Sequence, residues 1–488
     1  MNSIDPALRL VAFDPEIQLL APTCATLMAY PETSLPGGYR LAPSLAETEP
    51  VVSRDGRTYT FTVRKDARFS TGAPVTARAF SHALERILDP AMQSDGSLFA
   101  DIVGAADVMA GKATTPRGVF AKGRTLILRL TKHASDLRQR LTELCAVPPD
   151  LPSDPEGAKA PVPSPAPYYV SEYVPGQRVV LQRNRFYHGE RPHHVDRFVA
   201  DLTADEGTAL DQVLDGAVDT ALPTGLANAH SAELAKRFGV NRTQFFVAPG
   251  STIRLFYFNT SRPLFKNNVQ LRQAVNFAVD RKALAREDGF LVDTPIDQYL
   301  VPGTPGYRNA RIYPLAGPDL GRARALAKGH TRGGKAALYT LDLPVDVAQA
   351  QILQQNLRKI GLKLEIKPFP PPPSILFGKL STSGEPWELG RVRQGGFPDD
   401  PSILDCFKGS QCNFSHFDSP RFNRLLERAS RLTGEARSRA YGELDVEISR
   451  DAAPAIPVAI QNDLSFVSAR VGCVVVNPEL DLTAVCLK

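Results

Sequence analysis

The chain has 488 residues, more than one hydrophobic core normally supports, so we expect at least two packing units. Its content of 43% hydrophobic and 22% charged residues is that of a globular protein, and no run of about eighteen apolar residues could cross a membrane. The formal charge of +5 comes from lysines and arginines scattered along the sequence, which argues against nucleic acid as a partner.

The clearest change of hydrophobic pattern lies within residues 58–90. Aromatic and β-branched residues alternate with threonine from 58 to 63, which predicts a half-buried strand. After a loop, Thr76 can cap a helix that Pro90 ends. The apolar residues at helical spacing are Phe80, Ala83, Leu84, Ile87 and Leu88.

The rest of the first half alternates between short regular segments and loops. Eight of the twenty residues from 148 to 167 are proline, which predicts a loop. The neighbouring His193 and His194 point to different sides of an extended backbone, so a solvated loop is favoured over a metal site. We expect helices near 15–22, 135–144 and 209–218, a strand at 125–130, and two strands joined by the turn at Pro175 and Gly176.

The second half contains a strand and helix from 255 to 281, in which Phe256 and Phe258 alternate with Tyr257. The stripe of Leu271, Val275 and Ala278 is expected to be buried. Later segments predict a strand at 336–341, a helix at 345–360, a glycine helix end at 361, strands at 362–366 and 455–460, and a stiff proline run at 370–373.

Two of these segments also resemble a known family. The order TYTFTVRKDARFSTGAPVTARAF, with the lead-in LAPSLAETEPVVSRDGR, resembles the first signature of the extracellular solute-binding proteins of peptide-type ABC importers, solute-binding protein family 5. Residues 255–281 resemble its second signature, with matches at Phe258, Asn259, Pro263, Phe265, Arg272, Ala274, Ala278, Asp280 and Arg281.

The resemblance implies an α/β, two-lobed periplasmic-binding-protein-like fold of type II, with an extra subdomain in the first lobe. Residues 1–31 and 156–250 would form the main subdomain of the first lobe, 32–155 the extra subdomain and 251–465 the second lobe, with 466–488 returning to the first. Such a protein encloses a small solute, peptide-like or otherwise polar, between its lobes and delivers it to permease subunits of an ABC importer by hinge closure. We expect a monomer. The alternative is a ligand-sensing receptor domain of a larger regulatory protein with the same fold.

The N-terminus departs from the family pattern. Met1 is followed by neither a signal peptide nor a lipobox cysteine, and the family has a strand before the segment matched by Ser3 to Pro6. We therefore expect the native protein to be extracytoplasmic, in the periplasm or as a lipoprotein at the cell surface, with its targeting segment or membrane anchor absent from this chain.

The six cysteines contain no CxxC pair, which argues against a zinc ribbon or a thioredoxin-type motif. We expect the local disulfides Cys406 to Cys412 and Cys473 to Cys486, and by elimination Cys24 to Cys145. Free thiols in a cytosolic chain remain the alternative.

The sequence motifs do not favour an enzyme. The sequence contains no G-x-S-x-G, H-E-x-x-H or G-x-G-x-x-G motif. Residues 329–336 have P-loop spacing, but Ala336 replaces the magnesium-binding hydroxyl and the run precedes a strand, so we interpret it as a basic surface turn. We predict no catalytic residue, cofactor or metal.

Residues 387–401, WELGRVRQGGFPDDP, should form part of the ligand site. They resemble the family's W-x-x-D-Y-x-x-P, whose aspartate pairs with the α-ammonium of a bound peptide. Aligned on Pro401, the tryptophan position is Gln394 and the aspartate position is Phe397, or Gly396 after a shift of one, so the carboxylate is missing. Asp399 or Asp400 could replace it only in a rearranged loop, and both also fit as solvated turn residues.

Arg391 keeps a basic position that can face an anionic group in peptide-binding members. We therefore expect a ligand other than an ordinary free-amine peptide, because an ammonium buried without a partner costs several kcal/mol. The residues expected to hold the ligand are Tyr257, Asn259, Arg391, Gln394, Gly395, Gly396 and Phe397.

Overall fold

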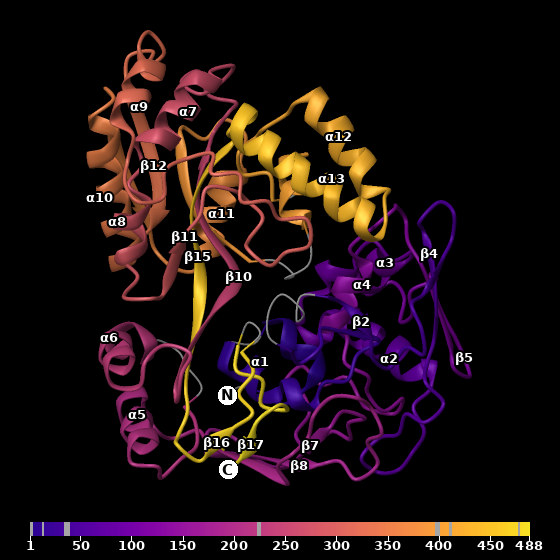
Figure 1. The fold of residues 1–488 in the computed structure, drawn as a ribbon. Coiled ribbons are helices and arrows are strands. Elements are labelled where there is room, and N and C mark those ends of the chain that lie inside the picture. The colour runs from indigo at the N-terminus through magenta and orange to yellow at the C-terminus, as the bar shows by residue number, and fades with distance from the viewer. Residues whose placement is uncertain are drawn as a thin grey trace. The chain divides into compact units, whose positions relative to one another are not determined.

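The computed structural model describes residues 3–11, 14–33, 40–221, 226–395, 401–408, 412–476 and 479–488 (Figure 1). The chain forms two compact α/β units. The first comprises Met1–Leu226, Phe238–Phe246 and Ser465–Lys488, and the second comprises Ala227–Arg237 and Val247–Leu464.

The chain changes unit within β10 (Phe245–Phe258) and within β15 (Ala455–Phe466). It also does so at both ends of α6 (Leu226–Phe238), of which residues Ala227–Arg237 are grouped with the second unit.

The first unit contains an antiparallel sheet of order β3-β4-β6-β5, against which α2 packs. The strand and helix predicted within 58–90 are confirmed, and the predicted apolar residues of α2 are all buried. Thr76 stands at the N-cap position, but its side chain makes no capping hydrogen bond. The elements are β3 (Val51–Val52), β4 (Thr58–Thr62), β5 (Val119–Lys122), β6 (Thr125–Arg129) and α2 (Ala77–Leu88).

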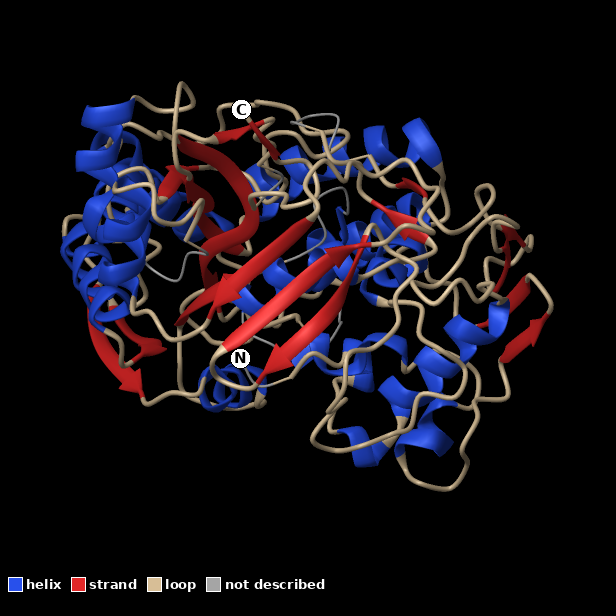
Figure 2. Ribbon diagram, turned by 90° about the horizontal axis from the view of Figure 1, so that it is seen from below, coloured by secondary structure: helices blue, strands red, loops and turns tan. Residues whose placement is uncertain are grey.

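A second antiparallel sheet of the first unit has the order β7-β8-β9, and Figure 2 shows its long arrows crossing the centre of the view. β7 (Tyr168–Val174) and β8 (Arg178–Arg183) meet at the predicted turn, where Gly176 has φ +69°. β9 (Arg197–Asp201) completes the sheet. Val179 and Leu181 on its inner face are fully buried against Leu19 and C-terminal residues such as Val467 and Leu482.

The remaining elements of the first unit are short. The helix predicted at 135–144 divides into α4 and a 3₁₀ turn, and the helix predicted at 209–218 begins and ends earlier. These elements are α1 (Asp14–Leu20), β1 (Met28–Ala29), β2 (Ala42–Pro43), α3 (Ala105–Met109), α4 (Leu137–Arg140), α5 (Glu206–Leu214), β16 (Val471–Gly472) and β17 (Cys486–Leu487).

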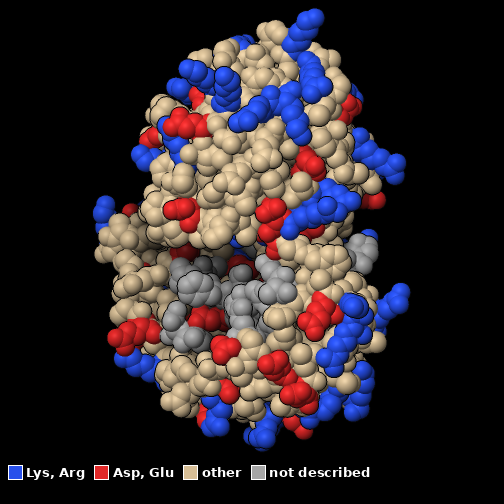
Figure 3. Space-filling view, turned by 90° about the vertical axis from the view of Figure 1, so that its left-hand side faces the viewer, with Lys and Arg blue, Asp and Glu red and all other residues tan. Residues whose placement is uncertain are grey.

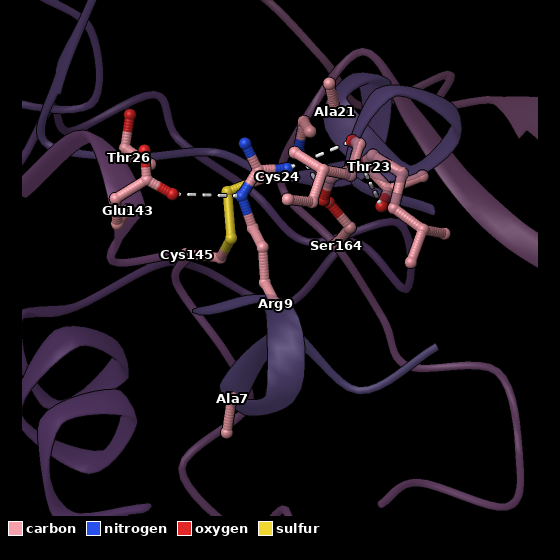
Figure 4. The surroundings of a disulfide bond; sticks show 12 residues. Ala7, Arg9, Ala21, Thr23, Cys24, Thr26, Glu143, Cys145 and Ser164 are labelled. Atoms are coloured by element: carbon pink, nitrogen blue, oxygen red, sulfur yellow. Dashed lines mark hydrogen bonds and ion pairs between the residues drawn. A yellow bond between two sulfur atoms is a disulfide. The ribbon is translucent and has the colours of Figure 1, made fainter. Parts of the chain in front are cut away.

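The structure contains the three disulfides Cys24–Cys145, Cys406–Cys412 and Cys473–Cys486. Figure 4 shows the first, beside the hydrogen bond from Arg9 Nε to Glu143 Oε2 at 3.3 Å. Its half-cystines are 121 residues apart, against 6 and 13 for the other two. Closing the longest loop removes the most chain entropy from the unfolded state, about 5 kcal/mol against about 2 kcal/mol for the shortest.

The second unit is built on a mixed six-stranded sheet of order β11-β15-β10-β14-β12-β13. β14 pairs antiparallel with β10 and parallel with β12, which in turn pairs parallel with β13. The predicted strand, helix and strand within 335–368 are confirmed as β12, α10 and β13, and Gly361 after the helix has φ +86°. The strands are β11 (Asp293–Pro295), β12 (Lys335–Leu341), β13 (Lys363–Phe369) and β14 (Leu389–Gln394), with β10 and β15.

Helices pack around this sheet (Figure 1), and the predicted buried stripe of α7 is fully buried. No helix among the described residues is both long and apolar enough to cross a membrane. The helices are α7 (Val269–Ala278), α8 (Arg281–Arg286), α9 (Leu320–Ala327), α10 (Pro344–Arg358), α11 (Pro373–Ser381), α12 (Pro420–Ser430) and α13 (Gly434–Glu447).

Two arginines of the second signature have a structural role. Arg272 donates hydrogen bonds to the carbonyl oxygens of Phe265 and Ala452, at 2.6 and 2.7 Å. Arg281 is fully buried and donates to the carbonyl oxygens of Ile296 and Pro457. Burial lowers the pKa of both guanidinium groups to about 10, so both stay charged at neutral pH. Arg272 and Arg281 therefore hold neighbouring loops to the sheet, and because both side chains are buried they are not accessible to a ligand.

Candidate functional site

The predicted ligand-binding residues lie mainly on the neighbouring strands β10 and β14. Tyr257 pairs with Gly390, and Phe256 pairs with Arg391. Directly opposite residues of an antiparallel pair point to the same face, and successive residues point to opposite faces. Tyr257 and Gln394 therefore share one face, which we call the aromatic face, whereas Arg391 points to the other, which we call the charged face.

The aromatic face is centred on Tyr257. This side chain is fully buried, and its hydroxyl donates a hydrogen bond to Gln394 Oε1. Its ring packs edge-on against Phe407 and Phe414, with centroids 6.1 and 5.7 Å away. Burial raises the pKa of Tyr257 well above its ordinary value, so the phenol stays neutral.

Gln394 connects Tyr257 to a disulfide. Its Nε2 lies 2.9 Å from the Sγ atom of Cys406, which is bonded to Cys412. A disulfide sulfur is a weak acceptor, so this amide N–H has capacity for a stronger partner. Gly395 follows at the strand end with an exposed backbone. Gly396, Phe397, Asp399 and Asp400 lie outside the described residues.

Gly390 lies opposite Tyr257 on the aromatic face, close to a side chain of α11. A Cβ atom at Gly390 would lie 2.6 Å from the Cδ2 atom of Leu380, in α11. The absence of a side chain at 390 therefore lets α11 approach the strand pair directly beside the tyrosine.

Arg391, on the charged face, is only 4% exposed. Its guanidinium forms an ion pair with Asp346 and donates from Nε to Gln349 Oε1 at 2.9 Å. Burial, with the nearby Arg393 and Arg254, lowers the pKa of Arg391 to about 9, so it remains charged at neutral pH. The structure thus gives Arg391 protein partners and does not bring it together with Tyr257 and Gln394.

More titratable groups line the same charged face. Arg254 forms ion pairs with Asp288 at 3.0 Å and with Asp293 at 2.7 Å. Burial, aided by the neighbouring Asp288 carboxylate, raises the pKa of Asp293 to about 7 against the opposing effect of Arg254. This network stabilises the packing of β10 and β14 against α8, α10 and β11.

Asn259 is engaged locally. Its Oδ1 accepts hydrogen bonds from the backbone N–H and the hydroxyl of Ser261, at 3.2 and 2.6 Å. The backbone N–H of Asn259 donates a hydrogen bond to the backbone carbonyl of Glu388. With 2% of its surface exposed, Asn259 fixes the turn after β10.

Sequence reasoning missed the partners on both faces. Phe407 follows Cys406 directly and Phe414 comes two residues after Cys412, but nothing in the sequence brings that loop to Tyr257. Asp346 and Gln349 are three residues apart on α10 and both buried, so polar residues on one helical stripe were the available signal.

The first unit contains a cavity of about 670 Å³, and the described part of the predicted ligand site, Tyr257, Asn259, Arg391, Gln394 and Gly395, does not line it. Its walls include an ion pair between Glu32 and Arg191 and another between Arg64 and Asp66. Burial raises the pKa of Glu32, although Arg191 opposes this shift. Among the described residues that line the cavity, four are acidic and four are basic, so their formal charges balance.

Comparison with protein families decides the class. The model for bacterial extracellular solute-binding proteins, family 5 Middle, matches residues 40–414. This chain belongs to that family. Both sequence signatures lie within the matched range, so the resemblance noted in the sequence is confirmed.

Curated relatives of this family 5 protein are similar over most of their length. The periplasmic oligopeptide-binding protein OppA of Escherichia coli (strain K12) is 24% identical over 475 residues, covering 91% of this chain and 83% of OppA. Heme-binding protein A of Haemophilus influenzae is 24% identical over 481 residues, with the same coverage of both chains. The relatives named here are binding proteins.

Solved structures show that this family 5 protein has the fold predicted from its sequence. Clavulanic acid biosynthesis oligopeptide binding protein 2 superposes with a TM-score of 0.84 at 23% identity, over 100% of this chain and 93% of its own. The unliganded open form of the murein tripeptide-binding protein MppA gives 0.81 at 20% identity, over 99% and 95%. The fold is therefore the two-lobed α/β fold of the periplasmic binding proteins.

Proposed function

We propose that this family 5 protein binds a small polar or peptide-like solute reversibly outside the cytoplasm and delivers it to the permease subunits of an ABC importer. The observation that carries this proposal is the family match over residues 40–414. Relatives are named for oligopeptides, murein tripeptide, heme and agropinic acid, so the family accommodates several ligand classes. We further propose that the protein acts as a monomer without catalysing a reaction on its solute.

The aromatic face is the part of the predicted site that we propose contacts the solute. Gln394 offers an N–H whose present acceptor is a sulfur atom, and Gly395 offers exposed backbone at the strand end. Gly396 and Phe397, which lie outside the described residues, remain proposed ligand contacts on the sequence resemblance alone. Tyr257 and Gln394 are neutral, and their described hydrogen bonds involve no carboxylate, which supports a ligand without a free α-ammonium.

Calorimetry can test the ligand class. The titrations compare di- to pentapeptides with N-acetylated versions of the same peptides, and a thermal-shift screen extends the set to oligosaccharides and metal chelates. Binding should raise the melting temperature by mass action, and acetylation should leave peptide affinity unchanged. Micromolar binding that disappears on acetylation would show that an α-ammonium anchor exists. Time-dependent product formation would contradict the non-enzymatic function.

A substitution tests the position of the site. Gln394→Ala should weaken the binding of whichever solute the screen identifies by about tenfold, since a ligand hydrogen bond is removed. The matched control is Gln273→Ala, because Gln273 donates to the Arg450 carbonyl on the outside of α7. Equal affinity of the Gln394 variant and the wild type would place the site elsewhere.

A further inference from the structure

One end of the second unit's sheet gathers cations that are scattered in the sequence. β12 and β13 are parallel and pair from their first residues, Lys335 and Lys363, so both lysines lie at the same sheet edge. α10 ends at this edge, as does the loop from α9 to β12. Eight exposed residues form what we call the basic end: Lys266, Arg324, Lys328, Arg332, Lys335, Arg358, Lys359 and Lys363.

Backbone contacts join these residues into one surface. Arg324 Nε donates to the carbonyl of Lys359 at 3.1 Å, and Arg332 Nη1 donates to the carbonyl of Lys266 at 2.8 Å. The N–H of Lys363 donates to the carbonyl of Gly334 at 2.6 Å. Figure 3 shows lysine and arginine side chains concentrated at the top of the view, on the side of α9 and α10.

The basic end has little negative charge to neutralise it. None of its eight cations forms an ion pair within the described part of the chain. Residues 320–363 contain two acidic residues, Asp342 and Asp346. Asp346 is buried against Arg391, and Asp342 follows β12 at the opposite edge of the sheet. The nearby Glu365 is paired with Lys367.

We propose that the basic end binds the anionic headgroups of a phospholipid membrane. Five of its eight residues are lysine, which protein interfaces deplete relative to arginine and aromatic residues. Tyr339, the one aromatic residue within 320–363, is buried, so this segment has no stacking platform for nucleic-acid bases. A cation beside an anionic leaflet strengthens binding roughly fivefold, and the attraction decays within a Debye length.

This inference goes beyond solute binding and does not depend on the identity of the solute. It would keep the second unit at the membrane surface through reversible electrostatic attraction, without insertion into the bilayer. The turn at 329–334, which resembles a P-loop by spacing, thus gains a role as one of the segments that present the cations.

Vesicle co-sedimentation of the full chain tests the proposal without any substitution. Vesicles containing phosphatidylglycerol should bind the protein at about 0.05 M salt. The affinity should fall about tenfold or more near 1 M salt, where the Debye length is about 3 Å. Vesicles of phosphatidylcholine alone should not bind it. Absence of binding to the anionic vesicles at low salt overturns the proposal.

A matched pair of variants locates the surface. Lys328→Gln, Lys335→Gln, Lys359→Gln and Lys363→Gln together should weaken vesicle binding by about tenfold or more. The control removes the same charge from exposed lysines of the first unit, through Lys65→Gln, Lys112→Gln, Lys122→Gln and Lys132→Gln, and should stay within about twofold of the wild type. Unchanged melting temperatures would verify that both variants fold.

Two results would contradict this location and this partner. An equal loss in both variants would mean that net charge, rather than the basic end, drives binding. Retention on polyglutamate or nucleic acid, without binding to anionic vesicles, would assign the surface to an acidic macromolecule.

Discussion

The aromatic and charged faces of the β10–β14 pair come from alternate residues of the same two strands, yet they are stabilised differently. On the aromatic face, Tyr257 and Gln394 are neutral, and among the described residues the acceptor of the Gln394 amide N–H is a weak one, the Cys406 sulfur. On the charged face, Arg391 is buried with Asp346 and Gln349 around its guanidinium. The difference teaches that a cation such as Arg391, although adjacent in sequence to the predicted ligand-binding residues, can stabilise the fold. The neutral residues on the other face of the same strands keep hydrogen-bonding capacity for a ligand.

The largest effect on stability should come from removing the buried cation of the charged face. Arg391→Met leaves the Asp346 carboxylate buried without its main partner and should lower the free energy of unfolding by about 3–5 kcal/mol, measured by urea denaturation. Adding Asp346→Leu should restore most of the loss, because both charges are then gone. A loss below about 1 kcal/mol, together with lost solute binding, would place Arg391 on the ligand side.

The pH dependence of stability should distinguish the two faces. Asp293 has a higher pKa in the folded protein, about 7, than its ordinary value of 3.8, so the folded state holds its proton more tightly. Its contribution is fully present below the ordinary value and is lost as the pH rises to about 7. Stability should therefore fall between these pH values, and Asp293→Asn should flatten the fall in urea midpoints. An identical slope in the variant would contradict this assignment. The aromatic face has Tyr257 as its titratable phenol, whose raised pKa lies far above this range.

A smaller effect should follow from Tyr257→Phe on the aromatic face. Loss of the hydrogen bond to Gln394 should lower the free energy of unfolding by about 0.5–1.5 kcal/mol and alter the thermal shift produced by the solute. Tyr313→Phe is the control, since Tyr313 is also buried and its hydroxyl donates to the Ser449 carbonyl at 2.8 Å. It should lose similar stability with no change in solute binding. If both variants altered binding equally, the effect would reflect general loosening of the unit.

The smallest effect should come from Arg393→Gln. Arg393 lies 3.6 Å from Asp346, but its side chain is 42% exposed, so removing it should change the free energy of unfolding by less than about 1 kcal/mol. Arg391 and Arg393 both lie beside the Asp346 carboxylate but differ in exposure, so comparing the two variants isolates the effect of burial. A cost equal to that of Arg391→Met would show that exposure does not separate them.

Local patterns predicted much of the fold and less of the site. The strand and helix at 58–90 and the βαβ unit at 335–368 have periodicities set by neighbouring residues, and their positions were nearly correct. Alternation also indicated that Tyr257 and its neighbours point to two faces. Which face meets α10 depends on contacts between Arg391 and Asp346, 45 residues apart, and the approach of Phe407 and Phe414 depends on another distant loop. Tertiary contacts of this kind leave no periodic signal in a single sequence.

The Cys24–Cys145 bridge has a consequence for proteolysis. It spans the segment that contains the β3-β4-β6-β5 sheet and its connecting loops. A single protease cut anywhere within that segment leaves two fragments that stay covalently joined until the disulfide is reduced. Non-reducing electrophoresis would then register a nicked chain at full mass, and the cut would become visible only after addition of a thiol.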